Sequence, residues 1–398
     1  MPEAFLVGGA RTPVGRYGGA LSSVRPDDLA ALVVKEAVQR AGIPSSSVEE
    51  VILGNANGAG EENRNVARMA WLLAGYEDTV PGITVNRLCA SGMSAIIMAS
   101  HMIKAGVDLG GRRIIKKSMS RAPWVMAKPT TAFAKPGDTF DTSIGWRFVN
   151  PIFQAQEKTT YSMPETAEEV ARVDEISRED ADAFAVGSQE KALAAIEAGR
   201  FADEIVPVTV KTRKGEIVVD TDEGPRAGTT AEVLGKLKPV VKGGSVVTAG
   251  NSSSLNDGAS AIVVASEAAL QKYGLTPRAR IVDGASAGVP APIMGIGPVP
   301  ATQKVLGRTG WSIDDLDAVE LNEAFASQSL ACIRRLGLDP SIVNNDGGAI
   351  ALGHPLGSSG SRIAITLLGR MEREGAEKGL ATMCVGVGQG TALLLERA

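Results

Sequence analysis

Residues 91–105 limit the possible folds of this chain most, because their pattern is helical and they are apolar on nearly every side. No charged residue occurs between Ser91 and Ile103. Such a helix has no polar face to offer to water, so we expect it to lie between other layers of the protein. A short apolar stretch at residues 83–85 precedes it and predicts a strand.

A second segment repeats this order of features. Residues 83–104 contain a strand pattern, the tetrapeptide Cys-Ala-Ser-Gly and the apolar helix. Residues 342–370 contain a strand pattern, a glycine-rich turn with Ser359 and Gly360, and another apolar helix. A plan that occurs twice in one chain indicates two similar halves. The 398 residues are enough for two or three domains.

Short apolar strands alternate with helices along much of the chain, which is typical of an α/β fold. Strands are predicted at 4–7, 51–53, 318–321 and 384–394, and helices at 65–74, 324–336 and after the capping residues Asp27 and Asp28. Residues 119–248 depart from this pattern, with scattered prolines, clustered aromatic residues and a polar helix near 178–198. They are predicted to form a long excursion from a core domain.

The composition excludes several classes of protein. Hydrophobic residues make up 44% and charged residues 22%, the mixture of an ordinary globular chain. The net charge of −4 gives no basic surplus that would hold nucleic acid. No stretch is long and apolar enough for a membrane span, and the N-terminus has no apolar signal region. We therefore expect a cytoplasmic protein with no nucleic-acid or membrane partner.

Cysteine and histidine are scarce. The cysteines are Cys89, Cys332 and Cys384, and the histidines are His101 and His354. An odd and sparse set of cysteines argues against a disulfide framework and for a reducing compartment. No Cys-x-x-Cys or His-Glu-x-x-His spacing is present, so no metal site is expected.

Cys89 directly precedes the buried helix. Backbone amides and the helix dipole at such a position favour the thiolate and can later hold an oxyanion. A buried structural cysteine is the alternative that the residues leave open. His354 lies among glycines, is followed by Pro355, and is interpreted as a general base. His101 follows the apolar helical pattern and is interpreted as structural.

Two further segments carry candidate groups. Cys384 begins a stretch with glycines at alternate positions up to Gly390, which would expose backbone amides; a packed strand is the alternative. Asn322 follows the strand predicted at 318–321, where an amide can orient a water or a carbonyl. Cys332 lies beside apolar residues of a helix and is interpreted as part of the core.

Together these segments resemble the thiolase family in order and spacing, over essentially the whole chain. The four segments are Asn86–Gly92, Asn322–Ala326, Gly347–Gly360 and Cys384–Gly390. Finer segments are similar to the 3-oxoadipyl-CoA thiolase subgroup: Arg11–Ser23, Ser118–Pro123, Asp141–Pro151 and Gly386–Gly390.

The resemblance implies the thiolase fold, an α/β fold with two similar βαβαβαββ halves in a layered αβαβα arrangement and an inserted loop domain. It places the N-terminal half at residues 1–118 and 249–270, the loop domain at 119–248, and the C-terminal half at 271–398. It also implies self-association as a homodimer or homotetramer.

The resemblance further assigns roles to residues of this chain. Cys89 would carry the acyl group, His354 would take its proton, and Cys384 would act as acid and base at the α-carbon of acetyl-CoA. One oxyanion hole would consist of the backbone amides of Cys89 and Gly386, and another of His354 with a water held by Asn322. Coenzyme A is implied as a substrate, with no bound cofactor.

Residues 249–257 resemble the family's coenzyme A loop, with Ala249 in the loop and Ser253 at the position that contacts pantetheine. Arg226 resembles an arginine near the nucleotide, although a solvated loop charge is its other interpretation. Phe325 resembles an aromatic residue that lines the thioester pocket. The subgroup resemblance implies cleavage of 3-oxoadipyl-CoA or short 3-oxoacyl-CoAs, and Arg147 is a candidate partner for a distal carboxylate.

Asp108–Ser118 departs from the family pattern, which has there a buried apolar strand and a Gly-Gly-x-Glu turn. Adjacent cations at Arg112–Arg113 and Lys116–Lys117 break the alternation of a half-buried strand. The stretch is therefore predicted to bulge towards solvent, or its charges to reach solvent or acidic partners at a subunit interface, unless the sequence carries a compensated reading-frame slip.

Three alternatives to a degradative thiolase stay open at this point. They are a biosynthetic acetyl-CoA acetyltransferase, a synthase relative that acts on carrier-protein thioesters, and a non-catalytic acyl-CoA-binding protein. The second active cysteine, Cys384, disfavours the synthase, and the complete set of motifs disfavours the binder.

Overall fold

The computed structural model describes residues 2–106, 112–117, 121–126 and 138–398. In this part of the chain ten strands form one large sheet in the order β12–β13–β14–β11–β1–β10–β5–β3–β4, with β2 paired to β10. The strands are β1 (Ala4–Arg11), β2 (Gly15–Arg16), β3 (Val51–Gly54), β4 (Gly82–Val85), β5 (Arg112–Lys117), β10 (Asn256–Ser266), β11 (Ala279–Gly288), β12 (Ala318–Leu321), β13 (Lys378–Val385) and β14 (Gln389–Arg397).

The sheet consists of two sections with the same pattern. In the first, β3 is parallel to β4 and β5, while β10 is antiparallel to β5 and β1. In the second, β12 is parallel to β13, and β14 is antiparallel to β13 and β11. A parallel bridge from Val319 to Val343 stands where the first section has β4. The sections join through β1 and β11, where Phe5 lies opposite Arg280 and Leu6 opposite Ala279.

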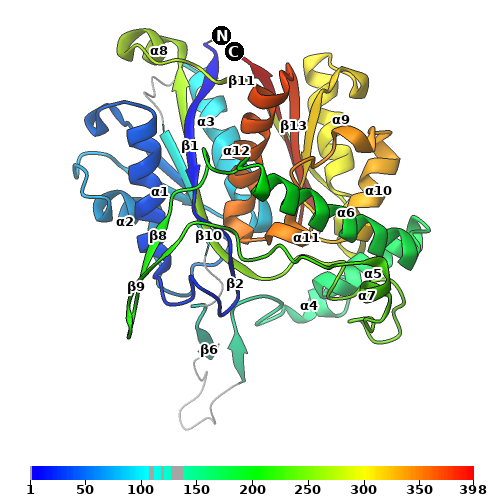
Figure 1. Ribbon diagram of the computed structural model, residues 1–398. Helices are drawn as coiled ribbons and strands as arrows, with labels where there is room; N and C mark the ends of the chain where they lie inside the picture. Colours follow the sequence, from blue (N-terminus) through cyan, green and yellow to red (C-terminus); the bar gives the residue numbers. More distant parts are fainter. Residues whose placement is uncertain (1, 107–111, 118–120, 127–137) are drawn as a thin grey trace.

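Two helices form the central layer (Figure 1): α3 (Ser91–Lys104) and α12 (Leu356–Glu374). They pack closely, because a Cβ on Gly360 would lie 2.4 Å from the backbone nitrogen of Met93. Ile96 of α3 and Leu367 of α12 belong to one buried apolar cluster. The predicted burial of the apolar helix is confirmed.

Other helices cover the outer faces of the sheet (Figure 1). The outer helices are α1 (Pro26–Arg40) and α2 (Val66–Leu73) on one section, and α9 (Pro298–Thr309) and α10 (Ala326–Leu336) on the other. A separate apolar cluster lies between the outer helices and each section of the sheet, one around Trp71 and the other around Leu394. The short helices α8 (Glu267–Tyr273) and α11 (Ala349–Leu352) lie in connections. The predicted α/β class and αβαβα layering are confirmed.

The described strands between residues 119 and 248 stay out of the large sheet. They pair as β6 with β7 and β8 with β9. The elements are β6 (Trp124–Met126), β7 (Thr139–Asp141), α4 (Pro151–Gln154), α5 (Met163–Val173), α6 (Arg178–Glu197), β8 (Val208–Thr212), β9 (Gly215–Val219) and α7 (Ala231–Gly235). The boundaries given above for the two halves and the loop domain stay a prediction.

Three local predictions differ from the structure. The final strand predicted at 384–394 is a hairpin that turns between Val385 and Gln389, because glycines let the backbone reverse there. Helix α1 begins at Pro26 after Arg25, so Asp27 and Asp28 lie in its first turn and do not cap it. Their carboxylates there interact favourably with the helix dipole. His101 is exposed rather than packed, and its Nε2 lies 3.1 Å from Asp283 Oδ1.

The predicted outward bulge near residue 112 is wrong for the backbone. Residues 112–117 form β5, in which Ile115 lies opposite Ser260 of β10, and Arg112 lies opposite Val51 of β3. Without β5, the facing edges of β3 and β10 would leave backbone groups unpaired, and this pairing outweighs the poor side-chain pattern. The side chains of β5, and residues 107–111 and 118–120, lie outside the described part.

Candidate active site

Cys89 lies in a 3₁₀ turn, η2 (Leu88–Ala90), that leads into α3. The turn is held by local hydrogen bonds: the Leu88 N–H donates to Asn86 Oδ1 (2.8 Å), and the Ser91 hydroxyl donates to the Leu88 carbonyl (2.7 Å). Leu88 has a φ of 45°, in the left-handed region that non-glycine residues seldom adopt. Cys89 is half-buried, so its thiol stands at the start of a buried helix with an exposed side.

Cys384 lies near the end of β13 and is buried. Burial raises the pKa of its thiol well above the usual range, and the Cys89 thiol is the next contributor in the same direction. Phe325 and Met294 belong to the same apolar cluster as Cys384. The two thiols are therefore close enough to interact, and Cys384 stays protonated at neutral pH.

Gly386 follows β13 and faces the Cys89 turn. A Cβ built on Gly386 would lie 3.0 Å from Leu88 Cδ1, so the two loops touch beside the nucleophile candidate. The same turn contains Val387 with a φ of 63° and Gly388 with a φ of 78°. Strained backbone therefore occurs on both sides of this contact.

The His354 imidazole is buried and held from two sides. Its backbone N–H donates to Asn256 Oδ1 (2.9 Å), and its Nδ1 lies 2.6 Å from Ser359 Oγ. The Ser359 hydroxyl donates to the Pro355 carbonyl (3.2 Å), so Nδ1 must carry the hydrogen between imidazole and serine. This tautomer leaves the lone pair on Nε2, which is the form of a general base.

Asn322 directly follows β12, and its backbone N–H donates to the Thr382 carbonyl of β13 (3.0 Å). The side chain is 1% exposed, yet neither Nδ2 nor Oδ1 has a hydrogen-bond partner among the described residues. A buried amide with both polar atoms unsatisfied is costly unless a water or a substrate oxygen completes it. The geometry thus leaves a donor and an acceptor beside β13.

Residues 249–257 connect these parts. The Ser253 N–H and hydroxyl both donate to the Ala324 carbonyl (3.0 and 2.9 Å), and Ser252 pairs with Phe325. At its far end Leu255 pairs with His354. Ser253 is half-buried and Phe325 is buried, so one loop holds the segments of Asn322 and His354 together.

The remaining sequence candidates lie as follows. Ala249 is exposed at the start of the same loop. Arg226 is exposed between β9 and α7, and its backbone N–H donates to Gln189 Oε1 of α6 (2.8 Å). Cys332 is buried in α10, and burial raises its pKa to about 12, as suits a core residue.

Sequence reasoning missed four polar residues that hold the site. They are Asn256 and Ser359 at His354, and Glu323 and Asn344 around Asn322. Asn256, Glu323 and Ser359 lie within segments that the sequence singles out, although no role at the site is assigned to them from sequence, and Asn344 lies three residues before one. A polar residue in or beside a motif is the signal that could have found them.

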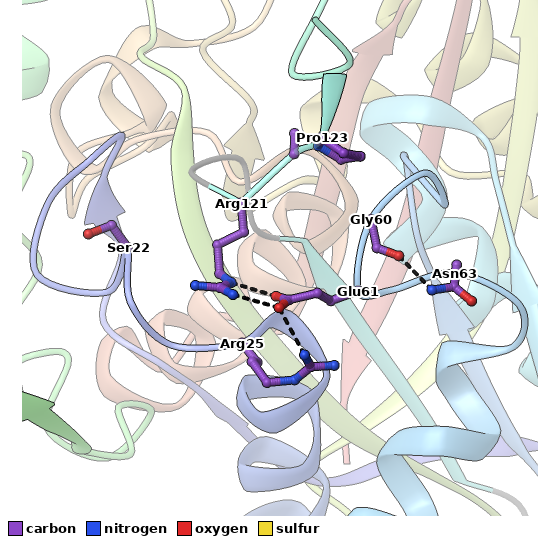
Figure 2. A pocket seen from close by; sticks show the side chains of 8 residues that line it. Ser22, Arg25, Gly60, Glu61, Asn63, Arg121 and Pro123 are labelled. Atoms are coloured by element: carbon purple, nitrogen blue, oxygen red, sulfur yellow. Dashed lines mark hydrogen bonds and ion pairs between the residues drawn. The ribbon is translucent and has the colours of Figure 1, made fainter. Parts of the chain in front are cut away.

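A cavity of about 590 Å³ lies elsewhere, at the loop of residues 60–63 (Figure 2). Arg25 and Arg121 both hold the Glu61 carboxylate there, at 2.9 and 2.6 Å. Arg121 is the main cause that lowers the pKa of Glu61. None of the candidate residues above lines this cavity, and we interpret the ion pairs as a link between loops.

The described ranges contain no group of His, Cys, Asp or Glu side chains spaced to hold a metal ion. Within the same ranges no helix has the length and apolarity to cross a bilayer.

The chain is an enzyme of acyl transfer, because it belongs to the thiolase family. The model of the thiolase N-terminal domain matches residues 4–268, and that of the thiolase C-terminal domain matches residues 275–397.

Particular relatives cover the whole chain. It is 56% identical to a beta-ketoadipyl-CoA thiolase of Pseudomonas aeruginosa, over 99% of both chains. It is 54% identical to a 3-oxoadipyl-CoA/3-oxo-5,6-dehydrosuberyl-CoA thiolase of Escherichia coli, over 100% of both. The crystal structure of Bacillus anthracis acetyl-CoA acetyltransferase is similar with a TM-score of 0.93 and 43% identity, covering 100% of this chain and 99% of that chain.

Proposed function

We propose that this thiolase cleaves 3-oxoadipyl-CoA with coenzyme A to give acetyl-CoA and succinyl-CoA. One structural observation carries the thiolytic chemistry: the turn that holds the half-buried Cys89 thiol touches Gly386, two residues after the fully buried Cys384, and burial raises the pKa of the Cys384 thiol. The Cys89 thiol suits a nucleophile and the Cys384 thiol a proton donor. The substrate rests on the names of relatives at 54–56% identity over the full length.

Cys89 begins the reaction in this proposal. His354 Nε2 takes the thiol proton, and the Cys89 sulfur attacks the 3-oxo carbonyl carbon. The bond between C2 and C3 then breaks, and its electron pair forms the enolate of acetyl-CoA. Cys384 donates its proton to the α-carbon, so acetyl-CoA leaves and the succinyl group stays on Cys89. Covalent catalysis divides one difficult cleavage into two easier steps.

Coenzyme A completes the cycle as a substrate. His354 first passes its proton to the Cys384 thiolate and then takes the proton of the coenzyme A thiol, whose sulfur attacks the acyl-Cys89 carbonyl. The bond between Cys89 and the acyl carbon breaks, His354 returns the proton to Cys89, and the acyl group leaves as the second thioester. Amides of Cys89 and Gly386 stabilise the negative oxygen on the acyl carbon, and His354 with a water on Asn322 stabilises the enolate oxygen. Removing one such donor typically costs about 10²–10³ in rate. The chain's own thiols and imidazole supply the nucleophile and the acid and base.

Binding of coenzyme A is assigned to residues 249–257 and their surroundings. Ser253 and Ala249 would meet the pantetheine arm, Phe325 the thioester, and the exposed Arg226 the nucleotide phosphates. The distal carboxylate of the substrate needs a cation. Arg147 is our candidate, and its guanidinium is held by Asn57 Oδ1 at 3.4 Å.

A second candidate function is synthesis or cleavage of acetoacetyl-CoA, favoured by similarity to the acetyl-CoA acetyltransferase structure. A thiolysis assay over 3-oxoadipyl-CoA, acetoacetyl-CoA and a long-chain 3-oxoacyl-CoA separates the two. We expect the highest kcat/KM for 3-oxoadipyl-CoA, and Arg147→Ala should lower that value at least about tenfold while sparing acetoacetyl-CoA. Equal use of acetoacetyl-CoA by the unaltered enzyme would support the second candidate.

Self-association as a homodimer or homotetramer is also proposed. Large apolar side chains outside the large sheet are exposed in the single chain, among them Trp124 at 67%, Phe148 at 53% and Ile152 at 76%. Large apolar side chains that a single chain leaves exposed are candidates for an association surface. Sedimentation analysis tests this; a monomer at micromolar concentration would contradict it. The cytoplasmic location stays a prediction.

A further inference from the structure

The buried amide of Asn322 has no hydrogen bonds of its own in the described structure, yet its two neighbours along the chain are firmly held. The Leu321 N–H donates to Asn344 Oδ1 (2.8 Å), and Asn344 Nδ2 donates back to the Leu321 carbonyl (2.8 Å). Asn344 Nδ2 also donates to Glu323 Oε1 (2.9 Å). One asparagine side chain therefore holds the residues on both sides of Asn322.

Glu323 extends this hold to two other elements. Its Oε2 accepts from the Ser188 hydroxyl of α6 (2.6 Å) and from the Ile350 N–H of α11 (3.2 Å). Ser188 Oγ in turn accepts from the Gly348 N–H (3.2 Å). All three groups that face the Glu323 carboxylate are donors, so the arrangement fits a group that only accepts.

The residues around the Glu323 carboxylate are tightly packed. Glu323 and Asn344 are both buried, and a Cβ on Gly348 would lie 2.1 Å from the Glu323 carboxyl carbon. Asn344 has a φ of 49°, a left-handed backbone that asparagine tolerates better than other side chains do. Burial raises the pKa of Glu323, while Ser188, Asn344 and the Ile350 amide act against that rise.

We propose that Glu323 and Asn344 form a clamp that positions the Asn322 side chain for its work on the enolate oxygen. The clamp is defined by Leu321, Glu323 and Asn344. Glu323 and Asn344 are positioning residues, since neither side chain touches the reacting atoms in this scheme. The inference rests on the oxyanion role proposed above for Asn322.

The clamp predicts a selective defect in Glu323→Gln. A glutamine turns an NH₂ group towards donors on one side, so one of the hydrogen bonds to Asn344, Ser188 or Ile350 must break. Misplacing a reacting group by about 1 Å can cost about 10²-fold in rate. Exchange of the α-protons of acetyl-CoA in D₂O should therefore fall at least about tenfold. Acetylation of Cys89, which does not use Asn322, should change less than about threefold.

Asn322→Ala provides the comparison. It should lower α-proton exchange by about 10²–10³-fold, and adding Glu323→Gln should lower it less than about threefold further, because a positioning residue acts only through Asn322. A merely structural role of Glu323 would instead slow exchange and acetylation together. It would also lower exchange again in the double variant.

Glu320→Gln is the matched control. Glu320 is buried on β12 close to the clamp, but its carboxylate accepts from Arg370 of α12 at 2.8 Å instead of holding residues 321–323. This variant should melt at a lower temperature and keep the unaltered ratio of exchange to acetylation. If Glu323→Gln does not fold, Ser188→Ala removes one donor from the same carboxylate and should show the same selective loss.

The outcomes separate the two proposals. Loss of exchange in Asn322→Ala but not in Glu323→Gln or Ser188→Ala overturns the clamp alone. If the losses of exchange rate in Asn322→Ala and Glu323→Gln multiply in the double variant, the clamp is overturned as well. Full exchange in Asn322→Ala removes the oxyanion role of Asn322, and the clamp falls with it.

Discussion

Leu88 and Gly386 meet beside Cys89, with Leu88 Cδ1 only 3.0 Å from the place that a Cβ on Gly386 would occupy. Leu88 comes from the turn before α3, and Gly386 from the turn after β13. The contact therefore joins the two sections of the fold at the point where we place one oxyanion hole. Any side chain at position 386 has to move Leu88, and Leu88 is covalently next to Cys89, the proposed nucleophile.

Gly386→Ala should consequently impair catalysis more than stability. Gly386 has no positive φ, so alanine can adopt its backbone, and the flexible end of Leu88 can shift by a few tenths of an ångström. We expect a small change in Tm and a loss in thiolysis kcat of at least about tenfold. Gly307→Ala on α9 is the control, since nothing lies within 4 Å of its Cβ position. Unchanged kcat in Gly386→Ala would show that the contact is irrelevant to the reaction.

The three cysteines should differ sharply in reactivity. Acetyl-CoA without an acceptor should label Cys89, and added coenzyme A should remove the label. Cys332 has a pKa raised to about 12 by burial, so its thiol should resist alkylation in the folded protein below about pH 10. Peptide mapping by mass spectrometry checks both statements. A label on Cys332 in place of Cys89 would overturn the assignment of the nucleophile.

Cys384→Ser should separate the two halves of the reaction. In the proposed scheme Cys89 and His354 suffice for acyl transfer, whereas proton transfer at the α-carbon needs a thiol, because a serine hydroxyl is too weak an acid and base. We expect Cys89 acetylation at nearly the normal rate and α-proton exchange reduced at least about 10²-fold. Equal loss of both activities would contradict this division of labour.

The pH dependence follows from the raised pKa of Cys384. A step that needs the protonated thiol should continue as pH rises through the ordinary cysteine pKa of about 8.5, and decline only above it. Protonation of the leaving enolate should therefore keep its rate up to at least about pH 9 in single-turnover thiolysis. A decline centred near pH 8 that is lost in Cys384→Ser would contradict the raised pKa.

Much of the site could be read from sequence because its motifs are local. A cysteine before an apolar helix and an asparagine after a strand are visible within ten residues, and the fold places both at element ends. The supports of His354 are not visible in this way. Asn256 lies 98 residues before it in the chain, and only the fold brings the pair to 2.9 Å.

The errors have physical causes of the same kind. Alternate glycines after Cys384 fit a strand and a turn equally well, and the choice depends on pairing between β13 and β14. At β5 the side-chain pattern argued against a strand, while the backbone partners β3 and β10, far away in sequence, required one. Local sequence patterns thus predict a helix or strand well when burial of its side chains determines the secondary structure. They predict it poorly when backbone pairing with strands far away in sequence determines it.

Val387→Gly should stabilise the protein. Val387 is β-branched and has a φ of 63°, whereas glycine adopts this region without the cost of about 1–2 kcal/mol. Its side chain is 42% exposed, so little apolar burial is lost. We expect a higher Tm, measured by calorimetry. Val387→Ala is the control and should gain less, because alanine keeps most of the strain; a lower Tm for the glycine variant would show that the valine contacts matter more than the backbone.

Replacing the cations of β5 should also stabilise the protein. This strand lies between β10 and β3, in the interior of the large sheet, although its sequence carries two adjacent pairs of cations, Arg112–Arg113 and Lys116–Lys117. Apolar β-branched residues at these four positions should raise Tm and strengthen self-association, because β-branched residues are favoured in strands and lysine is disfavoured there. Calorimetry and sedimentation of the two proteins check this. The same four changes made one at a time would locate the gain, and an unchanged Tm in all of these variants would mean that the cations of this strand do not limit the stability of the protein.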